Sequence, residues 1–366
     1  MTPDFKKILV LALAGAGDTL MATPFLKELR LACPHAQIDV LVLQGAVAHA
    51  VLDGNPNLNR LMLYDFVSEG RRRSLQFCLD LRREKYDVSF SLMPQNRFEY
   101  NLIARLIGAR ERIGFDYAVK CGALSRWLLT RTLREDESLH LADSNLRLLP
   151  EALDRPLQLR EHHLEIAVQE EHRAAAERFI QTHHLQGRRL IGFHPGSGTT
   201  KNLVLKRWGM VQWATLGRQL CEKYPDATLL LFGSKDEESL RAEIRTQSPL
   251  PAERLVDGGN LALKESAALL GKMQIMVCID GLPAHLAAAQ GVPCVALFGP
   301  TPPTATRPYG VPHRIARLDL PCSPCYRYSR RGIRCINPNF LQCLHDLAPA
   351  TVATLVDELL REVRTP

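Results

Sequence analysis

Short apolar runs alternate with longer amphipathic segments along the chain. In the first half, the apolar runs predict strands at residues 8–14, 38–43, 60–64, 87–92 and 112–115. Apolar residues three and four positions apart predict helices between them, including 74–85, 97–107 and one that begins with Thr23 as N-cap and Pro24 as its first residue. This alternation of strands and helices is typical of a parallel, doubly wound sheet.

The second half repeats the alternation, with strands predicted at 189–194, 227–232, 254–256, 275–279 and 293–298. Helices are predicted at 208–222, 236–245, 262–270 and 283–290, and a last helix at 351–364 has one apolar face. A polar stretch rich in His and Glu, roughly 155–186, separates the halves and contains a predicted helix at 170–183. We place the domain boundary in this stretch.

Composition supports a folded protein of about two domains. The chain has 366 residues, 46% hydrophobic and 23% charged, which excludes disordered, collagen-like and coiled-coil proteins. The net charge of +7 suits an anionic small molecule, an anionic membrane face or weak nucleic-acid binding equally well. The segment that begins with Lys6 and Lys7 and continues with the apolar run 8–14 is similar to a signal peptide. The run is short, however, and leads into a glycine-rich turn, so we expect a cytoplasmic protein.

The loops after the predicted strands carry the candidate chemistry, because ligands of open parallel sheets bind beyond the carboxyl ends of the strands. Residues 15–18, Gly-Ala-Gly-Asp, follow the first strand but lack the third glycine of a dinucleotide motif. Asp18 is interpreted either as a helix N-cap or as a general base facing a ligand.

Four loops at one predicted sheet edge of the second half suggest a nucleotide pocket, and the last of them is residues 297–301. Gly196 and Ser197 lie in a glycine- and hydroxyl-rich loop that leads to Lys206 and Arg207, and such a loop favours phosphate over a merely solvated connection. Further turns contain Glu237, and Asp280 with His285. The structural alternatives are an N-cap for Asp280 and a buried core histidine for His285.

The ten cysteines fall into two groups. Six are scattered in apolar or helical surroundings and are interpreted as buried hydrophobic residues: Cys33, Cys78, Cys121, Cys221, Cys278 and Cys294. The other four are clustered, and their spacing is close to that of a structural zinc or iron site of four thiolates: Cys322, Cys325, Cys335 and Cys343. The alternative for this cluster is four reduced thiols in a loop.

Together these residues resemble glycosyltransferase family 9, the ADP-heptose:lipopolysaccharide heptosyltransferases. The resemblance covers nearly the whole chain and is carried by these segments: 8–10 with Gly17-Asp18 and Thr23-Pro24, 112–115, 194–197, Lys206-Arg207-Trp208, 280–285, 291–293 and 296–301.

The resemblance implies a GT-B fold, in which two Rossmann-like, doubly wound α/β domains face a central cleft. Residues 1–165 would bind the acceptor, 185–347 would bind the nucleotide sugar and include the cysteine cluster 322–343, and the helix in 348–366 would pack back on the first domain.

The resemblance also implies roles for single residues in an inverting transfer without a catalytic metal, consistent with the lack of any D-x-D aspartate pair in the sequence. Asp18 would be the base, Lys206 would contact the donor diphosphate, and Glu237 would lie near the adenine. Residues expected around the donor ribose and phosphates are Gly196, Ser197, Arg207, Asp280, Gly281, Leu282 and His285. The family usually has Asp-Ser/Thr-Gly where this chain has Asp280-Gly281-Leu282, so a phosphate-binding hydroxyl is missing here.

Three functions follow as hypotheses. The first is transfer of a heptose or related sugar from an ADP-sugar to a lipid-linked lipopolysaccharide core acceptor at the inner membrane face, where cations of the first domain would suit a phosphorylated acceptor: Lys6, Lys7, Arg30, Arg71, Arg72, Arg73, Arg110 and Arg112. The second is transfer to a protein, as in autotransporter heptosyltransferases, whose iron-binding finger the four cysteines resemble. The third is nucleic-acid binding through the aromatic and basic stretch 326–331; the other motifs favour a nucleotide sugar, and no stable nucleic-acid partner is expected.

Overall fold

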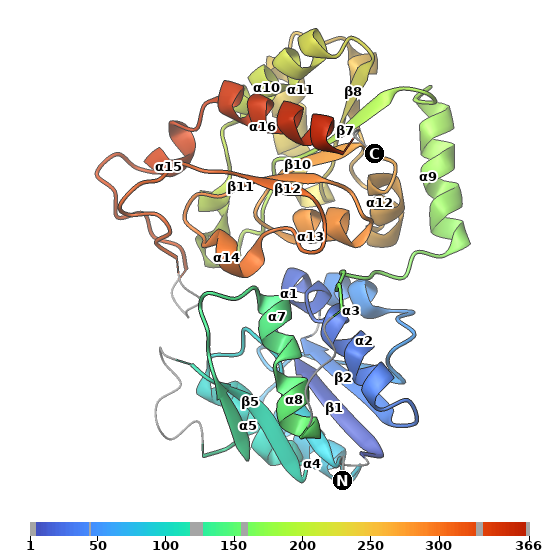
Figure 1. Ribbon diagram of the computed structural model, residues 1–366, viewed down its shortest axis with the longest axis vertical. Helices are drawn as coiled ribbons and strands as arrows, with labels where there is room; N and C mark the ends of the chain where they lie inside the picture. The colour runs from blue at the N-terminus through green and yellow to red at the C-terminus, as the bar shows by residue number, and fades with distance from the viewer. Residues whose placement is uncertain (1–4, 44, 118–126, 155–159, 327–331, 364–366) are drawn as a thin grey trace. The chain divides into compact units, whose positions relative to one another are not determined.

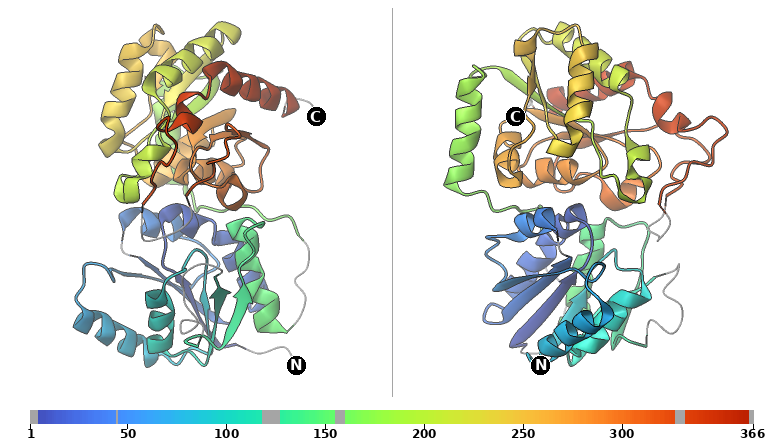
Figure 2. Two further views of the ribbon diagram at one scale, coloured as in Figure 1. Left: turned by 90° about the vertical axis from the view of Figure 1, so that its left-hand side faces the viewer. Right: turned by 180° about the vertical axis from the view of Figure 1, so that it is seen from behind.

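A computed structural model describes residues 5–43, 45–117, 127–154, 160–326 and 332–363 (Figure 1). The chain forms two compact units, Met1–Ala167 and Val168–Pro366, and each is described by itself. Each unit contains a six-stranded sheet, and the further views in Figure 2 show helices on both faces of each sheet. The predicted doubly wound α/β architecture is therefore confirmed for both units.

The sheet of the first unit has the order β3-β2-β1-β4-β5-β6, and all its strand pairs are parallel. Its strands are β1 (Lys7–Ala12), β2 (Gln37–Leu43), β3 (Arg60–Tyr64), β4 (Val88–Ser91), β5 (Glu111–Asp116) and β6 (Arg131–Arg134). The first five match the predicted runs. The pattern missed β6 because this edge strand of four residues has arginine at both ends and no buried position.

The helices of the first unit are α1 (Ala16–Leu20), α2 (Thr23–Ala32), α3 (Ala46–Leu52), α4 (Arg71–Arg82), α5 (Phe98–Ile107), α7 (Leu141–Leu146) and α8 (Leu148–Leu153). One core lies between the sheet and the pair α4 and α5, and it contains Leu9 and Leu11 of β1 together with Leu81 and Ile107. The prediction of Thr23 as an N-cap was wrong. Its hydroxyl donates to the Leu20 carbonyl and accepts the N–H of Glu165, so it ties the end of the unit to α2.

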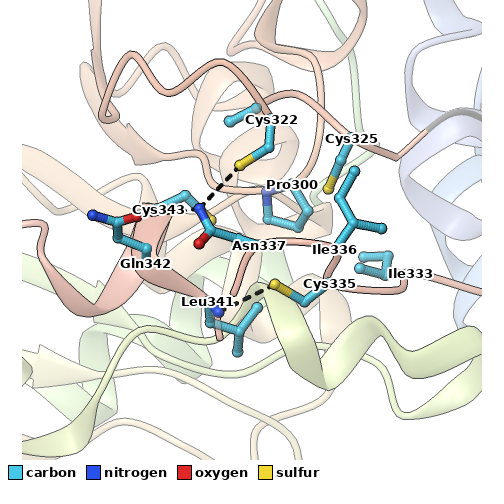
Figure 3. A pocket seen from close by; sticks show the side chains of 11 residues that line it. Pro300, Cys322, Cys325, Ile333, Cys335, Ile336, Asn337, Leu341, Gln342 and Cys343 are labelled. Atoms are coloured by element: carbon cyan, nitrogen blue, oxygen red, sulfur yellow. Dashed lines mark hydrogen bonds between the residues drawn. The ribbon is translucent and has the colours of Figure 1, made fainter. Parts of the chain in front are cut away.

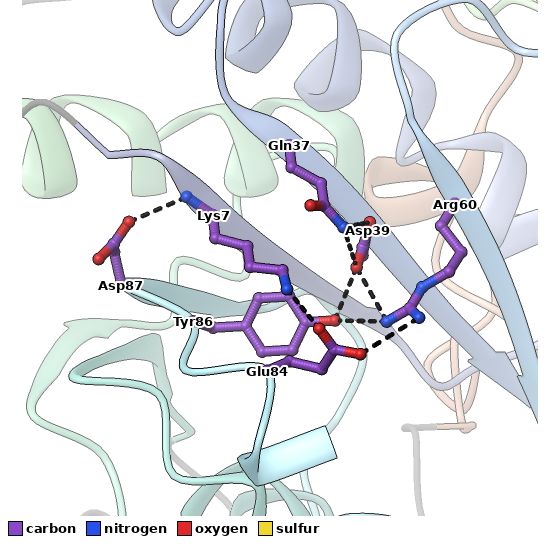
Figure 4. A network of polar contacts seen from close by, with 7 residues as sticks. All are labelled: Lys7, Gln37, Asp39, Arg60, Glu84, Tyr86 and Asp87. Carbon is purple, nitrogen blue, oxygen red and sulfur yellow. Dashed lines mark hydrogen bonds and ion pairs between the residues drawn. The ribbon is translucent and has the colours of Figure 1, made fainter. Parts of the chain in front are cut away.

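A polar network stabilises the amino-terminal edge of this sheet (Figure 4). At its centre is the fully buried carboxylate of Asp39, which accepts hydrogen bonds from Gln37 at 3.1 Å and from the Tyr86 hydroxyl at 2.7 Å, and pairs with Arg60 at 3.0 Å. Burial and this carboxylate raise the pKa of Tyr86, so the phenol stays protonated. Because the network lies at the edge opposite the strand-end loops, we assign it a structural role.

The sheet of the second unit has the order β12-β11-β10-β7-β8-β9 and is also parallel. Its strands are β7 (Arg189–His194), β8 (Ala227–Leu231), β9 (Leu255–Asp257), β10 (Ile275–Ile279), β11 (Cys294–Leu297) and β12 (His313–Ala316). The edge strand β12 was missed, because only its last residue is buried. The central strands β7, β8, β10 and β11 are buried throughout, which explains their continuous apolar runs.

The helical segments of the second unit are α9 (Glu170–Thr182), η1 (Thr200–Lys206), α10 (Met210–Lys223), η2 (Lys235–Glu237), α11 (Glu238–Gln247), η3 (Ala252–Arg254), α12 (Leu263–Leu270), α13 (Leu282–Ala289), α14 (Pro303–Thr306), α15 (Gln342–His345) and α16 (Pro349–Glu362). Helix α9 packs on α12, so the part of the polar stretch 155–186 that follows Ala167 belongs to this unit. Among the described residues, no helix combines the length and the apolar character needed to cross a membrane.

The last helix, α16, packs on α10 and β12 of the second unit. That the helix in 348–366 also packs on the first domain stays a prediction. Its apolar face, with Val352, Val356 and Leu359 fully buried, joins the core formed by α10 and the sheet. The amphipathic pattern correctly predicted a helix with one buried face, but it contains no information about which surface covers that face.

The scattered cysteines behave as predicted where the structure describes them. Five are buried: Cys33, Cys78, Cys221, Cys278 and Cys294. Cys121 lies outside the described residues.

Candidate functional site

The loops at the carboxyl ends of β7, β8 and β10 place several of the predicted donor residues together in the second unit. Lys206, at the end of η1, donates to the Asp280 carboxylate at 2.8 Å, and both side chains are almost fully buried. The Thr306 hydroxyl donates to the other Asp280 oxygen at 3.1 Å. Burial raises the pKa of Asp280, but the Lys206 ammonium outweighs it and lowers that pKa overall. A lysine ammonium and a carboxylate thus lie next to the turn that leads into α13.

The glycine- and hydroxyl-rich loop after β7 is held by Arg207. This side chain donates to the Ser197 hydroxyl at 3.0 Å and to the Ser197 carbonyl at 2.7 Å, and the hydroxyl donates onward to the Leu203 carbonyl at 3.0 Å. A Cβ on Gly196 would come within 2.0 Å of the Glu237 carboxylate, so a larger residue there would displace this side chain. Arg207 and Ser197 therefore shape the loop, and their contact with the donor stays a prediction.

Glu237 has a structural function that the sequence did not reveal. Its carboxylate accepts the N–H of Ser234 at 2.8 Å and the Ser234 hydroxyl at 3.1 Å, and lies 3.5 Å from Nε2 of His194. Burial opposes ionisation, but His194 and the two Ser234 hydrogen bonds lower the pKa of Glu237 to about 2. Glu237 is therefore a carboxylate that fastens the turn after β8 to the end of β7.

The same turn depends on Arg241, which sequence analysis missed. Its guanidinium is fully buried and donates to the Ser234 carbonyl and to Asp257, both at 2.7 Å, so it joins the ends of β8 and β9. A Cβ on Gly259 would come within 2.1 Å of this guanidinium. The nearest sequence signal is the pair of glycines at 258 and 259 directly after a strand, which indicates a close approach of another group.

The turn after β10 contains the departure from the family pattern. Gly281 is the N-cap of α13, and Leu282, its first residue, is half-buried. The backbone N–H of Gly281 takes no part in the α-helical ladder, as is general at a helix N-terminus. The turn therefore keeps backbone donors, and the missing hydroxyl is not replaced by the leucine side chain.

His285, in the first turns of α13, is buried beside Asp280. Burial, as the main cause, lowers its pKa from 6.5 to about 4, although the Asp280 carboxylate opposes this. Its Nδ1 has no hydrogen-bond partner among the described residues. At neutral pH the imidazole is therefore uncharged.

The depressed pKa of His285 predicts a pH dependence of stability. The unfolded chain binds this proton below pH 6.5 and the folded chain only near pH 4, so the free energy of unfolding should fall as pH drops through this window, by up to about 1.4 kcal/mol per pH unit. His285→Gln should reduce the slope measured by urea unfolding between pH 7.5 and 5. His345→Gln, at an exposed position, is the control. Equal slopes for His285→Gln and the parent would contradict this origin.

Asp18 belongs to the first unit, directly after β1. It is the third residue of α1, and its carboxylate accepts the N–H of Gly15 at 3.1 Å. Gly15 is the N-cap, so the interpretation of Asp18 as the N-cap was wrong, although its carboxylate does help to cap α1. Asp18 is half-buried, and its charge is among the causes that raise the pKa of Tyr100 on α5.

The clustered cysteines line one pocket between β11 and α15 (Figure 3): Cys322, Cys325, Cys335 and Cys343. Burial and the other three thiols raise the pKa of Cys343 to about 11. Asn337 donates to the Cys322 sulfur at 3.3 Å, and the N–H of Leu341 donates to the Cys335 sulfur at 3.2 Å. Nevertheless, within the described residues no three His, Cys, Asp or Glu side chains are close enough to hold a metal ion. Residues 327–331 of the aromatic and basic stretch lie outside the described part.

Comparisons with known proteins agree with the fold. Residues 75–332 match the sequence model of glycosyltransferase family 9 (heptosyltransferase). Lipopolysaccharide heptosyltransferase 2 of Escherichia coli (strain K12) is 26% identical over 97% of this chain and 98% of its own length.

Two solved structures have the same fold. The glycosyl transferase family 9 structure from Veillonella parvula superposes with a TM-score of 0.76 at 26% identity, covering 99% of both chains. The structure of E. coli ADP-heptose lps heptosyltransferase II covers 98% of this chain and 100% of its own, with a TM-score of 0.72 at 24% identity. The predicted GT-B fold is thereby confirmed. Because the family match spans most of the sequence, this protein belongs to glycosyltransferase family 9 and is a glycosyltransferase.

Proposed function

We propose that this enzyme transfers a heptose from an ADP-sugar to an acceptor of the lipopolysaccharide core, at the cytoplasmic face of the inner membrane. The observation that carries the donor half of this proposal is the buried pair of Lys206 and Asp280 beside the N-terminus of α13. A lysine ammonium and backbone N–H groups are the donors that a nucleoside diphosphate requires. The names of the relatives, which are heptosyltransferases of lipopolysaccharide, supply the sugar and the acceptor class.

The proposed mechanism is an inverting displacement. The acceptor hydroxyl attacks the anomeric carbon from the face opposite the diphosphate, Asp18 takes the hydroxyl proton, and the diphosphate leaves with its negative charge held by Lys206. Positioned positive charge and backbone N–H groups can stabilise such a leaving group without a metal ion. His285 is neutral and its Nδ1 has no partner among the described residues, and we propose that it donates a hydrogen bond to the ADP-sugar.

Two measurements test this function. Thermal shift assays with ADP, UDP and GDP should show the largest rise in melting temperature with ADP, because a ligand that binds only the folded state stabilises it. Radiolabelled ADP-heptose should then label core lipopolysaccharide that lacks heptose, but not an autotransporter protein. Labelling of the protein alone would favour the protein-acceptor alternative, and no stabilisation by any nucleotide would refute a nucleotide-sugar donor.

We also propose that the four clustered cysteines bind one structural zinc or iron ion. Four thiols facing one pocket, two of them accepting N–H hydrogen bonds, have the donor chemistry for such an ion, although metal binding must draw them closer together. We expect about one zinc or iron per chain by elemental analysis, and loss of the metal in Cys343→Ser but not in Cys221→Ser, a buried cysteine elsewhere. Metal-free protein with four titrating thiols at these positions would contradict the proposal.

A further inference from the structure

Helix α4 of the first unit presents an outward stripe that the proposed reaction does not use. Leu75 and Leu79, one turn apart, are 44% and 37% exposed. At about 100° per residue, Arg71, Arg72 and Arg82 lie in the same arc of roughly 100° and enclose the two leucines. Cys78 and Leu81 lie on the side of the helix that adjoins this arc and are buried in the core.

The stripe carries positive charge without compensation. Arg71 and Arg72 have no ion pair within the described residues, and Arg82 reaches only the Leu106 carbonyl at 3.5 Å. The acidic residues nearby lie off the stripe and are paired elsewhere, Asp80 with Arg83 and Glu69 with Arg73. Each stripe arginine is therefore available to an external anion.

Neighbouring segments extend this surface. Helix α4 packs on α5, which places the exposed Arg105 on the adjoining helix (Figure 1). Burial, Arg105 and Arg82 together lower the pKa of Arg112, and no carboxylate counteracts them. In the turn before α4, Val67 is 86% exposed, the highest value among the exposed large hydrophobic residues described.

We infer that this surface of α4 docks the enzyme on an anionic lipid bilayer. Leucines enclosed by arginines, with no acidic residue between them, form the pattern of a helix that lies in a membrane interface: the apolar side chains enter the boundary region and the guanidinium groups pair with lipid phosphates. A soluble anion or an RNA would use the arginines but would not require the exposed leucines. The inference rests on the proposed function, since a lipid-linked acceptor requires the enzyme at a bilayer.

Vesicle flotation tests the inference. We expect the full-length protein to bind vesicles of phosphatidylethanolamine and phosphatidylglycerol at 0.1 M salt, to dissociate at 0.5 M salt, and to bind pure phosphatidylcholine weakly. Arg71→Gln/Arg72→Gln should weaken binding to the anionic vesicles by about 10- to 30-fold, since each arginine near such a surface contributes about 1 kcal/mol. Leu75→Ser/Leu79→Ser should also weaken it. The matched control is Leu31→Ser/Val211→Ser, which removes two apolar side chains that are 52% and 62% exposed elsewhere and should bind like the parent.

The affinity for ADP, measured in parallel without vesicles, separates the two proposals. Unchanged ADP affinity in both α4 variants with reduced vesicle binding supports the docking surface. Three results would overturn it. Leu75→Ser/Leu79→Ser could bind anionic vesicles as tightly as the parent does, the parent could bind neutral vesicles as tightly as anionic ones, or the parent could bind RNA but not vesicles. Absence of ADP binding by the parent would refute the proposed donor site. The vesicle measurements would still decide whether the surface of α4 docks on a bilayer.

Discussion

Asp18→Asn is expected to reduce the rate of sugar transfer by roughly 10²- to 10⁴-fold, the usual cost of losing a general base. An acceptor hydroxyl is a poor nucleophile until a base takes its proton, and an amide oxygen cannot hold that proton. The amide can still accept the N–H of Gly15, so α1 and the fold should persist. The measurement is the single-turnover rate with ADP-heptose and acceptor, together with the melting temperature and the ADP affinity, both of which should stay near the parent values.

Asp87→Asn is the matched control for this variant. Asp87 is also a half-buried aspartate that accepts backbone N–H groups, those of Lys6 and Lys7, but it lies at the opposite edge of the sheet. Its variant should retain the full transfer rate. If Asp18→Asn retains it too, the carboxylate has only its capping function and another residue is the base.

The second large effect concerns the buried ion pair. Replacing Lys206 alone would leave the Asp280 carboxylate buried without its partner, and breaking a buried pair in this way typically costs about 3–5 kcal/mol of stability. Lys206→Met should therefore be combined with Asp280→Asn, so that no buried carboxylate is left without its partner. The double variant should fold, and it should bind ADP more weakly by roughly 1.5–3 kcal/mol, because a charge-assisted contact to the diphosphate is lost.

Asp280→Asn alone completes the comparison, since it keeps Lys206 and removes the competing carboxylate; it breaks the same buried pair, so its melting temperature should fall as well. It should bind ADP at least as tightly as the parent by isothermal titration calorimetry. Equal ADP affinity for the double variant and Asp280→Asn would show that Lys206 does not contact the diphosphate, and a phosphate site would then have to lie elsewhere.

Sequence patterns predicted most of the fold because ten of the twelve strands in the described part of the chain are apolar runs bounded by turns. The two missed strands, β6 and β12, are edge strands with few buried positions, so hydrophobic periodicity contains little signal for them. The sequence also did not predict the surface against which α16 packs. An amphipathic pattern shows that one face of a helix is buried, but it does not show which element covers that face.

For the candidate site, the sequence predicted which residues lie in the strand-end loops, but it did not predict the contacts between them. Lys206 and Asp280 are 74 positions apart, and their pairing depends on η1 and β10 ending at the same sheet edge. Glu237 contacts the end of β7, and Arg241 contacts the end of β9. Both contacts join residues that are far apart in the sequence, so they depend on the three-dimensional fold. Arg241 lies in an ordinary charged helix of the sequence, so nothing in the local pattern separates it from a solvated arginine.

The packing of α16 on the second unit has a consequence for synthesis of the protein. Each unit is one uninterrupted stretch of chain, so the sheet of the first unit is complete before any strand of the second has been translated. Domains of this kind fold as units, the N-terminal one first, while the chain is still being made. The second unit, in contrast, cannot bury the apolar side of α10 and β12 until α16 has left the ribosome, and a chain cut short before α16 would expose that surface.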